Sequence, residues 1–235
     1  MNVYLNSITG IDDAIVAMYF SKRTWTRELE EHIRKTCAKK FVFHNSTKED
    51  DEEIDKWISQ ICKMGWKHIT ILRYIDFSVT VEGLHRAGQD DWDAHAKRYD
   101  NRIIRSSTRL ATFDYEMSDY YKDKIIPTDI ALYQLGIEAP SEIEHNGIKY
   151  VKTVNGYIRE DMKDNKDVKR GLYMLSIPSN FIFKVNLTEW AHVYKERNEN
   201  GTANPEVKEL AENLATLIEE QIPQFDRKLL LKIMN

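Results

Sequence analysis

The sequence predicts an α+β fold in which helices flank a mixed or antiparallel sheet. Segments with the two-residue alternation of strands and segments with the spacing of amphipathic helices both occur among the 235 residues. They do not follow one another as regular β-α-β units, which a doubly wound parallel sheet would need. The length suits one domain or a tight two-lobed unit, and we expect a single domain over residues 1–235.

The first third of the chain has the pattern of a strand followed by helices. We expect a strand over Met1–Ile8, helices over Ile11–Phe20, Trp25–Ala38 and Ser46–Met64, and a short strand over Phe41–Phe43. Asp12 and Asp13 would lie in the first turn of the first helix, where carboxylates are favoured by the helix dipole. Ser46 or Thr47 would cap the third helix, which begins with an acidic run.

The rest of the chain mixes strand-forming segments with turns and two further amphipathic helices. We expect strands over Ile69–Val81, Ile103–Phe113 and Gly171–Val185, helices over Asp90–Tyr99, Thr188–Arg197 and Pro205–Gln221, a hairpin over Glu142–Arg159, a charged loop over Asp161–Asp167, and irregular or helical structure over Asp119–Gly136. The hairpin follows from Asn146-Gly147 and Asn155-Gly156, because Asn-Gly pairs fit tight hairpin turns. Asn204-Pro205-Glu206 gives the last helix a capping residue and a proline at its first position.

Composition excludes several classes of protein. With 34 basic and 38 acidic residues the formal net charge is -4, so we expect no nucleic-acid partner. No apolar run approaches the roughly 20 residues of a membrane helix, and we expect no membrane partner. The two cysteines, Cys37 and Cys62, form no CxxC pair, and no secretory signal precedes them. We therefore expect two free thiols in a reducing, cytoplasmic protein.

Several catalytic motifs are absent from the sequence. It contains no P-loop, no GxGxxG run and no GxSxG elbow, which argues against a Rossmann cofactor site and a serine hydrolase. Its histidines and cysteines do not cluster at the spacing of metal ligands, so we expect no metal site.

Three polar side chains share one face of the expected strand over Ile103–Phe113. Strand periodicity places Arg105, Ser107 and Arg109 together, on a face that then turns apolar. Guanidiniums suit a phosphate, because their planar fork donates two parallel hydrogen bonds. An exposed edge strand with solvated arginines would give the same pattern.

A further arginine ends the apolar stripe of the helix over Thr188–Arg197. Trp190, Val193, Tyr194 and Arg197 recur at helical spacing, so Arg197 points inward near the end of the helix. It would pair there with a helix carbonyl or with a ligand, and the periodicity does not decide between them. Arg170 is uninformative by itself.

The C-terminal segment resembles the flavin-dependent thymidylate synthases. That family reads N-x-R-x-x-x-x-F-x-x-x-R and then A-Q-x-E-I-R-x-x-A, against NLTEWAHVYKER over 186–197 and ANPEVKELA over 203–211 here. The family also has an arginine sixteen residues before the asparagine, where this sequence has Arg170. Its signature R-H-R-x-x-S-x-N-x-x-S-x-R-Y aligns without gaps to KRYDNRIIRSSTRL over 97–110.

The resemblance implies which residues bind the nucleotide. The family positions that bind the deoxyuridylate through its phosphate and pyrimidine fall on Ser107, Arg109, Arg170 and Arg197, and Arg197 is the expected catalytic residue. The flavin-side positions are less well kept. The family's R-H-R becomes Lys97, Arg98 and Tyr99, its signature Asn becomes Ile104, and its flavin-binding Arg becomes Thr188. The residues expected on the cofactor side are His68, Lys97, Arg98, Tyr99, Arg105, Asn186 and Thr188.

The resemblance also implies a reaction and an assembly. The reaction is the reductive methylation of dUMP to dTMP on FAD, with methylenetetrahydrofolate and NADPH as co-substrates and without a protein nucleophile. The assembly is a homotetramer of thymidylate synthase-complementing-like subunits with shared active sites. Two alternatives stay open: an enzyme on the same scaffold that modifies another pyrimidine nucleotide, such as dCMP, or adds a hydroxymethyl group, and a catalytically silent nucleotide-binding or scaffolding relative.

Overall fold

The computed structural model describes most of the chain in two units. Its described residues are 1–65, 68–93, 102–107, 128–153, 156–165, 168, 175, 177–198 and 204–233. The first unit comprises Met1–Val81, Asp91–Ile104 and Phe181–Asn235, and the second comprises Glu82–Asp90 and Arg105–Asn180. The single domain over residues 1–235 stays a prediction.

A four-stranded sheet carries the first unit, and three of its strands run on into the second. The order is β1 (Asn2–Thr9), β2 (Asp76–His85), β7 (Pro178–Asn186) and β3 (Arg102–Arg105). Alternate residues of β2 and β7 are buried, among them Phe77, Val79, Phe181, Phe183 and Val185. One face of the sheet therefore supplies the core, as period-two patterning requires.

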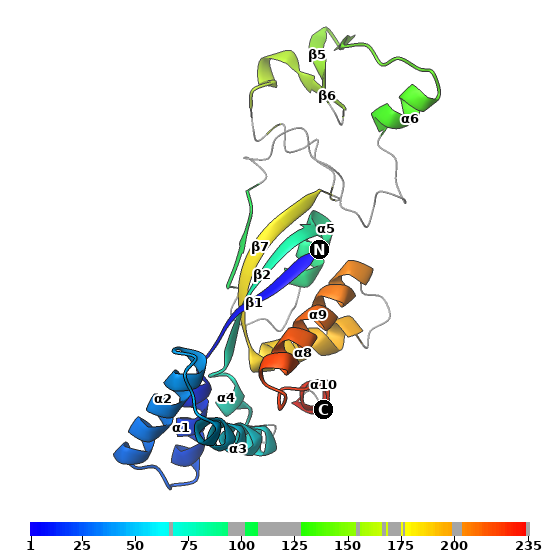
Figure 1. Cartoon of the computed structure of the whole chain (residues 1–235). Helices are drawn as coiled ribbons and strands as arrows, with labels where there is room; N and C mark the ends of the chain where they lie inside the picture. The colour runs from blue at the N-terminus through cyan, green and yellow to red at the C-terminus, as the bar shows by residue number, and fades with distance from the viewer. Residues whose placement is uncertain are drawn as a thin grey trace. The chain divides into compact units, whose positions relative to one another are not determined.

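Helices α8 (Leu187–Asn198), α9 (Pro205–Gln221) and α10 (Arg227–Ile233) form the C-terminal layer of the first unit, and α9 packs against β1 (Figure 1). The buried residues of α9 are Val207, Leu210, Ala211, Leu214, Ala215 and Ile218, which is the stripe of an amphipathic helix. Asn204 caps α9 and Pro205 begins it, as predicted. Helix α10, which has seven residues and buries Leu229, Leu230 and Ile233, was not predicted from the sequence.

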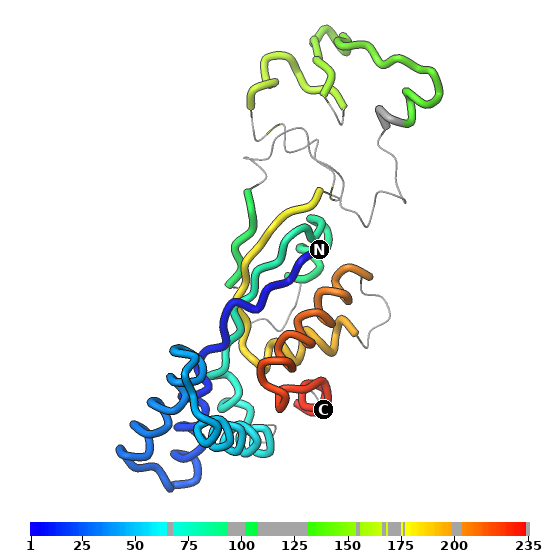
Figure 2. The backbone as a smooth tube through the Cα atoms, in the orientation of Figure 1, coloured from blue at the N-terminus to red at the C-terminus, as the bar shows by residue number. Residues whose placement is uncertain are grey.

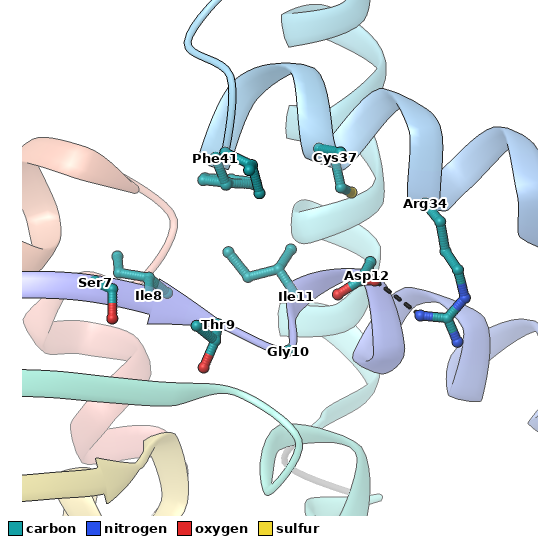
Figure 3. Close-up of a pocket in the computed structure, with 11 residues that line it drawn as sticks. Ser7, Ile8, Thr9, Gly10, Ile11, Asp12, Arg34, Cys37 and Phe41 are labelled. Carbon is teal, nitrogen blue, oxygen red and sulfur yellow. Dashed lines mark hydrogen bonds and ion pairs between the residues drawn. The ribbon is translucent and has the colours of Figure 1, made fainter.

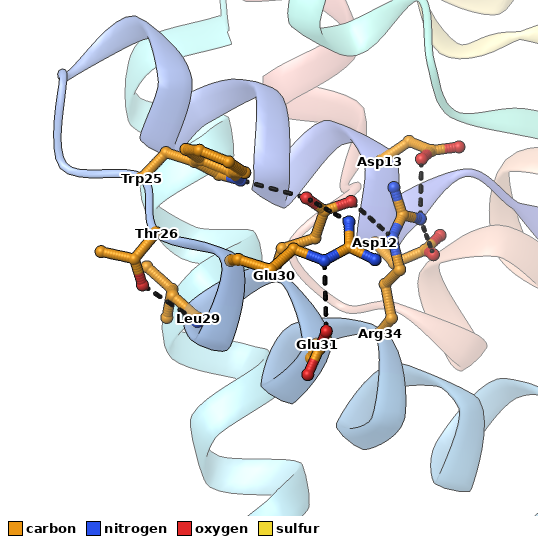
Figure 4. A network of polar contacts seen from close by, with 9 residues as sticks. Asp12, Asp13, Trp25, Thr26, Leu29, Glu30, Glu31 and Arg34 are labelled. Atoms are coloured by element: carbon orange, nitrogen blue, oxygen red, sulfur yellow. Dashed lines mark hydrogen bonds and ion pairs between the residues drawn. The ribbon is translucent and has the colours of Figure 1, made fainter.

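A bundle of α1 (Ile11–Ser21), α2 (Arg27–Phe41), α3 (Lys48–Gly65) and α4 (Ile69–Leu72) completes the first unit (Figure 2). Arg34 ties α2 to α1, because its guanidinium donates to Asp12 at 2.8 Å and to Asp13 at 2.9 Å (Figure 4). Thr47 caps α3, as expected, by accepting from the backbone N of Asp50 at 3.2 Å.

One predicted strand in this region is wrong, and a second predicted strand segment is confirmed only in its second half. Phe41 ends α2, and the two residues after it form a turn with the backbone N of Val42 bonded to Ala38, so there is no strand over Phe41–Phe43. The segment Ile69–Val81 begins as helix α4 and becomes strand only at Asp76. Short runs of β-branched and aromatic residues carry too little information to override neighbouring helix formation.

Gly10 makes the turn from β1 into α1. Its φ is 78°, a left-handed conformation that side chains with a Cβ rarely adopt. A Cβ at this position would lie 1.8 Å from the backbone oxygen of Tyr74. The start of α1 therefore sits directly against the chain that leads into β2.

A separate antiparallel sheet belongs to the second unit. It consists of β4 (Glu142–His145), β5 (Ile148–Thr153) and β6 (Gly156–Arg159), paired in that order. Asn146 and Gly147 form the first turn with φ of 54° and 74°, which confirms the predicted turn. Helix α6 (Thr128–Gln134) precedes this sheet, and the short 3-10 helix η1 (Glu160–Met162) opens the expected charged loop. Of the described side chains between 131 and 165, only Ile158 is buried.

Helix α5 and strand β3 differ from prediction in their bounds. Helix α5 (Arg86–Asp93) begins four residues before the expected helix over Asp90–Tyr99, whose remainder lies outside the described residues. Strand β3 is described only at the start of the segment expected over Ile103–Phe113. None of the helices in the described part of the chain is long and apolar enough to cross a membrane.

Candidate functional site

Asn186 caps helix α8 with its side-chain oxygen. Oδ1 accepts hydrogen bonds from the backbone N of Thr188 at 3.1 Å and of Glu189 at 3.0 Å. The hydroxyl of Thr188 donates to the same oxygen at 2.7 Å. Because the cap uses only Oδ1, the Nδ2 group of Asn186, which donates to no described residue, remains able to bind an acceptor.

Arg197 lies at the other end of α8 and points inward, as its periodicity predicted. Its side chain is only 11% exposed and follows the buried Trp190, Val193 and Tyr194. Its Nη1 donates to Oδ1 of Asp91 at 2.9 Å, and its Nη2 donates to the backbone oxygen of Asp91. Its Nε is buried and has no hydrogen-bond partner among the described residues. Both hydrogen-bond acceptors of the guanidinium therefore belong to Asp91 of α5, and Nε is left without an acceptor among the described residues.

Glu212 of α9 holds the same end of α8 from another side. Its Oε1 accepts from the hydroxyl of Tyr194 at 3.0 Å and from Nδ2 of Asn198 at 2.8 Å. Burial is the larger cause that raises the pKa of the Tyr194 phenol, and the hydrogen bond to Glu212 raises it further. The last turn of α8 is therefore fixed by polar contacts as well as by its apolar face.

Arg105 ends strand β3, the edge strand of the four-stranded sheet. Its side chain is 18% exposed, and its guanidinium pairs with the carboxylate of Asp90 and donates to the backbone oxygen of Gln89 at 3.1 Å. Strand β3 is therefore an edge strand, as that alternative predicted, but the Arg105 guanidinium is paired and not solvated. Ser107 is exposed and lies two residues beyond the strand.

His68 lies at the start of α4 with an exposed side chain. Its backbone N donates to the carbonyl oxygen of Met64 and its own carbonyl accepts from the backbone N of Ile71, while its φ of -125° and ψ of 60° are not helical. It belongs to the first unit, as do Asn186, Thr188 and Arg197, whereas Arg105 and Ser107 belong to the second.

A family model described as "Thymidylate synthase complementing protein" matches residues 15–224. The chain belongs to this family. The resemblance seen in the C-terminal segment and the signature is therefore confirmed, and the chain is a member of the family of flavin-dependent thymidylate synthases. The sequence matches no curated protein.

Solved structures of the thymidylate synthase complementing protein fold are similar to this chain throughout. One is flavin-dependent thymidylate synthase ThyX from Helicobacter pylori complexed with FAD and dUMP, with a TM-score of 0.54, 12% identity and 99% of each chain covered. Another is Thymidylate Synthase X from the same organism with FAD and dUMP, with a TM-score of 0.53, 12% identity and full coverage of both chains. At this identity the likeness shows the fold alone, and it confirms the predicted α+β class.

Five of the residues expected at family positions lie outside the described residues. They are Lys97, Arg98, Tyr99, Arg109 and Arg170. The meeting of Arg109, Arg170 and Arg197 around one nucleotide therefore stays a prediction, and so do the roles of all the expected site residues.

Two carboxylates beside the expected site were missed by the sequence analysis. Asp90 pairs with Arg105 within the second unit, and Asp91 pairs with Arg197 within the first. The available signal was the position of two adjacent acids immediately before a tryptophan, Trp92, which is 2% exposed. Buried arginines need such partners, because an unpaired charge in a protein interior is costly.

A cavity of about 220 Å³ lies elsewhere in the first unit, between the end of β1, the start of α1 and helix α2 (Figure 3). Its lining includes Ile8, Ile11, Cys37 and Phe41, with the ion pair of Asp12 and Arg34 at one side. None of the expected site residues of this family member lines it. Burial raises the pKa of the Cys37 thiol to about 12, so the sulfur facing this cavity is neutral.

Proposed function

We propose that this chain is an FAD-dependent thymidylate synthase that reductively methylates dUMP to dTMP. Methylenetetrahydrofolate would supply the carbon and NADPH would reduce the flavin. The family match over residues 15–224 supports the class of enzyme. The similar Helicobacter pylori structures contain FAD and dUMP, the two ligands that the proposal needs.

The observation that carries the proposal is the position of Arg197. Its guanidinium is nearly buried, its Nε lacks an acceptor among the described residues, and it falls on a family position that binds dUMP. A buried donor without a partner costs roughly 1 to 3 kcal/mol, and a ligand oxygen would remove that cost. In the proposal Arg109, Arg170 and Arg197 hold the phosphate and polarise the pyrimidine, and Ser107 donates or accepts a further hydrogen bond.

On the cofactor side, Asn186 is better able than Thr188 to donate a hydrogen bond to FAD. The α8 cap leaves the amide donor of Asn186 available, whereas the Thr188 hydroxyl is buried and donates to Asn186. Thr188 cannot supply the charge of the family's arginine, so Lys97 and Arg98 would meet the pyrophosphate and Tyr99 would stack on a ring. His68 and Arg105 complete the proposed cofactor residues. When bound and reduced, FAD supplies hydride, and the protein contributes position and charge.

The two cysteines of the sequence support a mechanism without a thiolate nucleophile. Neither is in a disulfide, as predicted. Burial raises the pKa of both the Cys37 and the Cys62 thiols to about 12. Both sulfurs are therefore protonated at neutral pH, where only a thiolate would attack the pyrimidine.

The first test is the absorption spectrum of the purified full-length protein, followed by turnover. We expect flavin absorbance and, with dUMP, methylenetetrahydrofolate and NADPH, dTMP identified by mass spectrometry. A matched incubation with dCMP checks the choice of pyrimidine. A colourless protein that gains no flavin absorbance with added FAD, yet is thermally stabilised by dUMP, would contradict the proposal and favour a silent relative.

We further propose that the protein is a cytoplasmic homotetramer whose subunits share their active sites. Light scattering coupled to size-exclusion chromatography should give four times the 27.7 kDa of one chain. A monomer that forms dTMP would contradict shared sites. The expectations that it binds neither nucleic acid nor membranes stay predictions.

A further inference from the structure

Asp91 contacts Arg197 twice, through its side chain and through its backbone. The carboxylate oxygen accepts from Nη1 at 2.9 Å, and the carbonyl oxygen of the same residue accepts from Nη2. The Arg197 side chain is 11% exposed and that of Asp91 is 35% exposed. A long, flexible arginine side chain is thus held at both ends of its fork by one residue.

Asp91 is itself anchored by its neighbour in the chain. Trp92 is buried, with its ring centroid 5.3 Å from that of Phe183 and 6.2 Å from that of Trp190. Trp190 and Arg197 are seven residues apart on α8 and share a face. The end of α5 therefore docks on α8 at two levels, an aromatic contact in the core and the ion pair near the helix end.

The opposite anchor on α8 limits how Arg197 can move. Glu212 binds Tyr194 and Asn198 on either side of Arg197 in the sequence, and it also accepts from Nε of Arg227 at 3.2 Å. With the backbone of the last turn fixed, the direction of the Arg197 guanidinium depends on Asp91. The Nε donor is then held ready for an acceptor that the described residues do not provide.

We propose that Asp91 is the positioning residue of Arg197, which it orients for the nucleotide without touching the nucleotide itself. The inference rests on the proposed function, because it takes Arg197 as a dUMP-binding residue. The pair holds in advance a side chain that binding would otherwise have to order, and such preorganisation raises affinity. The carboxylate also neutralises the charge of Arg197, so orientation rather than net charge is what Asp91 contributes.

The test is a double-mutant cycle on dUMP affinity, measured by isothermal titration calorimetry with the full-length protein. Asp91→Ala should weaken the Kd for dUMP about tenfold, the size of effect expected for one charge-assisted hydrogen bond. Asp91→Asn should weaken it only about threefold, since the amide oxygen still accepts from Nη1. In an Arg197→Met background, Asp91→Ala should change the Kd less than about twofold, because the residue on which it acts is gone.

Asp12→Asn is the matched control. Asp12 also accepts from an arginine of the first unit, at 2.8 Å from Arg34, and its side chain is 31% exposed, close to the 35% of Asp91. We expect wild-type dUMP affinity from this variant. If Asp91→Ala fails to fold, as circular dichroism would show, Asp91→Asn carries the comparison in both backgrounds.

The outcomes separate the inference from the proposed function. A wild-type protein that binds no dUMP overturns the proposed function and the inference with it. If the wild-type protein binds dUMP and the Asp91 variants bind it equally well or more tightly, only the inference is overturned. The inference is also overturned if the Asp91 variants lose as much dUMP affinity in the Arg197→Met background as in the wild type.

Discussion

The first unit and the small β4–β5–β6 sheet of the second unit are organised by different forces. In the first unit, core residues such as Trp92 and Trp190 fix the places where polar side chains meet. In the small sheet, Ile158 is the one buried residue among the described side chains of 131–165, so turns and cross-strand pairs must define its structure. Local backbone chemistry specifies the second arrangement, whereas packing over long sequence distances specifies the first.

Two glycines with the same conformation provide the sharpest test of this difference. Gly10 in the first unit has φ of 78° and Gly147 in the small sheet has φ of 74°. Gly147→Ala meets no atom within 4 Å and should cost only left-handed strain, about 1 to 2 kcal/mol. Gly10→Ala adds a collision with the Tyr74 backbone and should cost about 2 to 5 kcal/mol in total. Urea unfolding of both variants measures the two losses.

Hydrogen exchange locates each loss. The Gly147→Ala loss should be confined to the amides of β4 and β5, and the Gly10→Ala loss should spread through the first unit. Equal costs for the two substitutions would show that the turn alone decides both positions, and the contrast between the two regions would fail.

The sequence predicted most where local signals were strong. The bounds of α9 came out as expected because Asn204 and Pro205 mark its start, and the hairpin turn came from Asn146-Gly147. Helix α10 was missed because seven residues give too little periodicity to recognise. The fold class followed from the mixture of strand and helix patterns, and it did not depend on the exact first and last residue of any element.

For the candidate site, the sequence predicted a direction but not a partner. The face of α8 placed Arg197 inward from a pattern within one helix. Its partner Asp91 lies 106 residues away, and no local pattern links residues at that separation. The acidic partners of Arg105 and Arg197 are neighbours in the sequence, and only the fold shows which arginine each of them contacts.

A medium effect is expected at Asn186, where the core-anchored helix α8 begins. Asn186→Ala removes three hydrogen bonds to the cap and should cost about 1 to 2 kcal/mol of unfolding free energy. It should also weaken FAD binding, because the amide donor is lost. Asn186→Ser keeps a capping oxygen without that donor, so it should retain most of the stability while FAD affinity falls about tenfold.

Flavin titration by fluorescence and thermal unfolding measure the two properties separately. If Asn186→Ser binds FAD as tightly as the wild type, Asn186 serves the helix alone and its proposed cofactor role is wrong.

The smallest effect concerns pH and compares one ion pair in each unit. Asp76 of the first unit accepts from Arg102 at 2.8 and 2.9 Å and lies 3.4 Å from Lys184. Burial alone would raise the pKa of the Asp76 carboxyl, but Arg102 and Lys184 outweigh it and hold that pKa below its usual range. A depressed folded-state pKa adds stability that is present above the unfolded pKa, about 3.9, and is lost as pH falls through the folded value.

Asp76→Asn should therefore lower stability at neutral pH and flatten its decline below about pH 4, as followed by urea unfolding across pH. In the small sheet, Glu142→Gln removes a pair with Lys149 whose side chains are 52% and 47% exposed. Because solvent screens such surface pairs, the stability of that variant should decline at acid pH as that of the wild type does. If Glu142→Gln flattens this decline as much as Asp76→Asn does, burial in the first unit adds nothing to an ion pair. The distinction between the two regions would then rest on backbone and apolar packing alone.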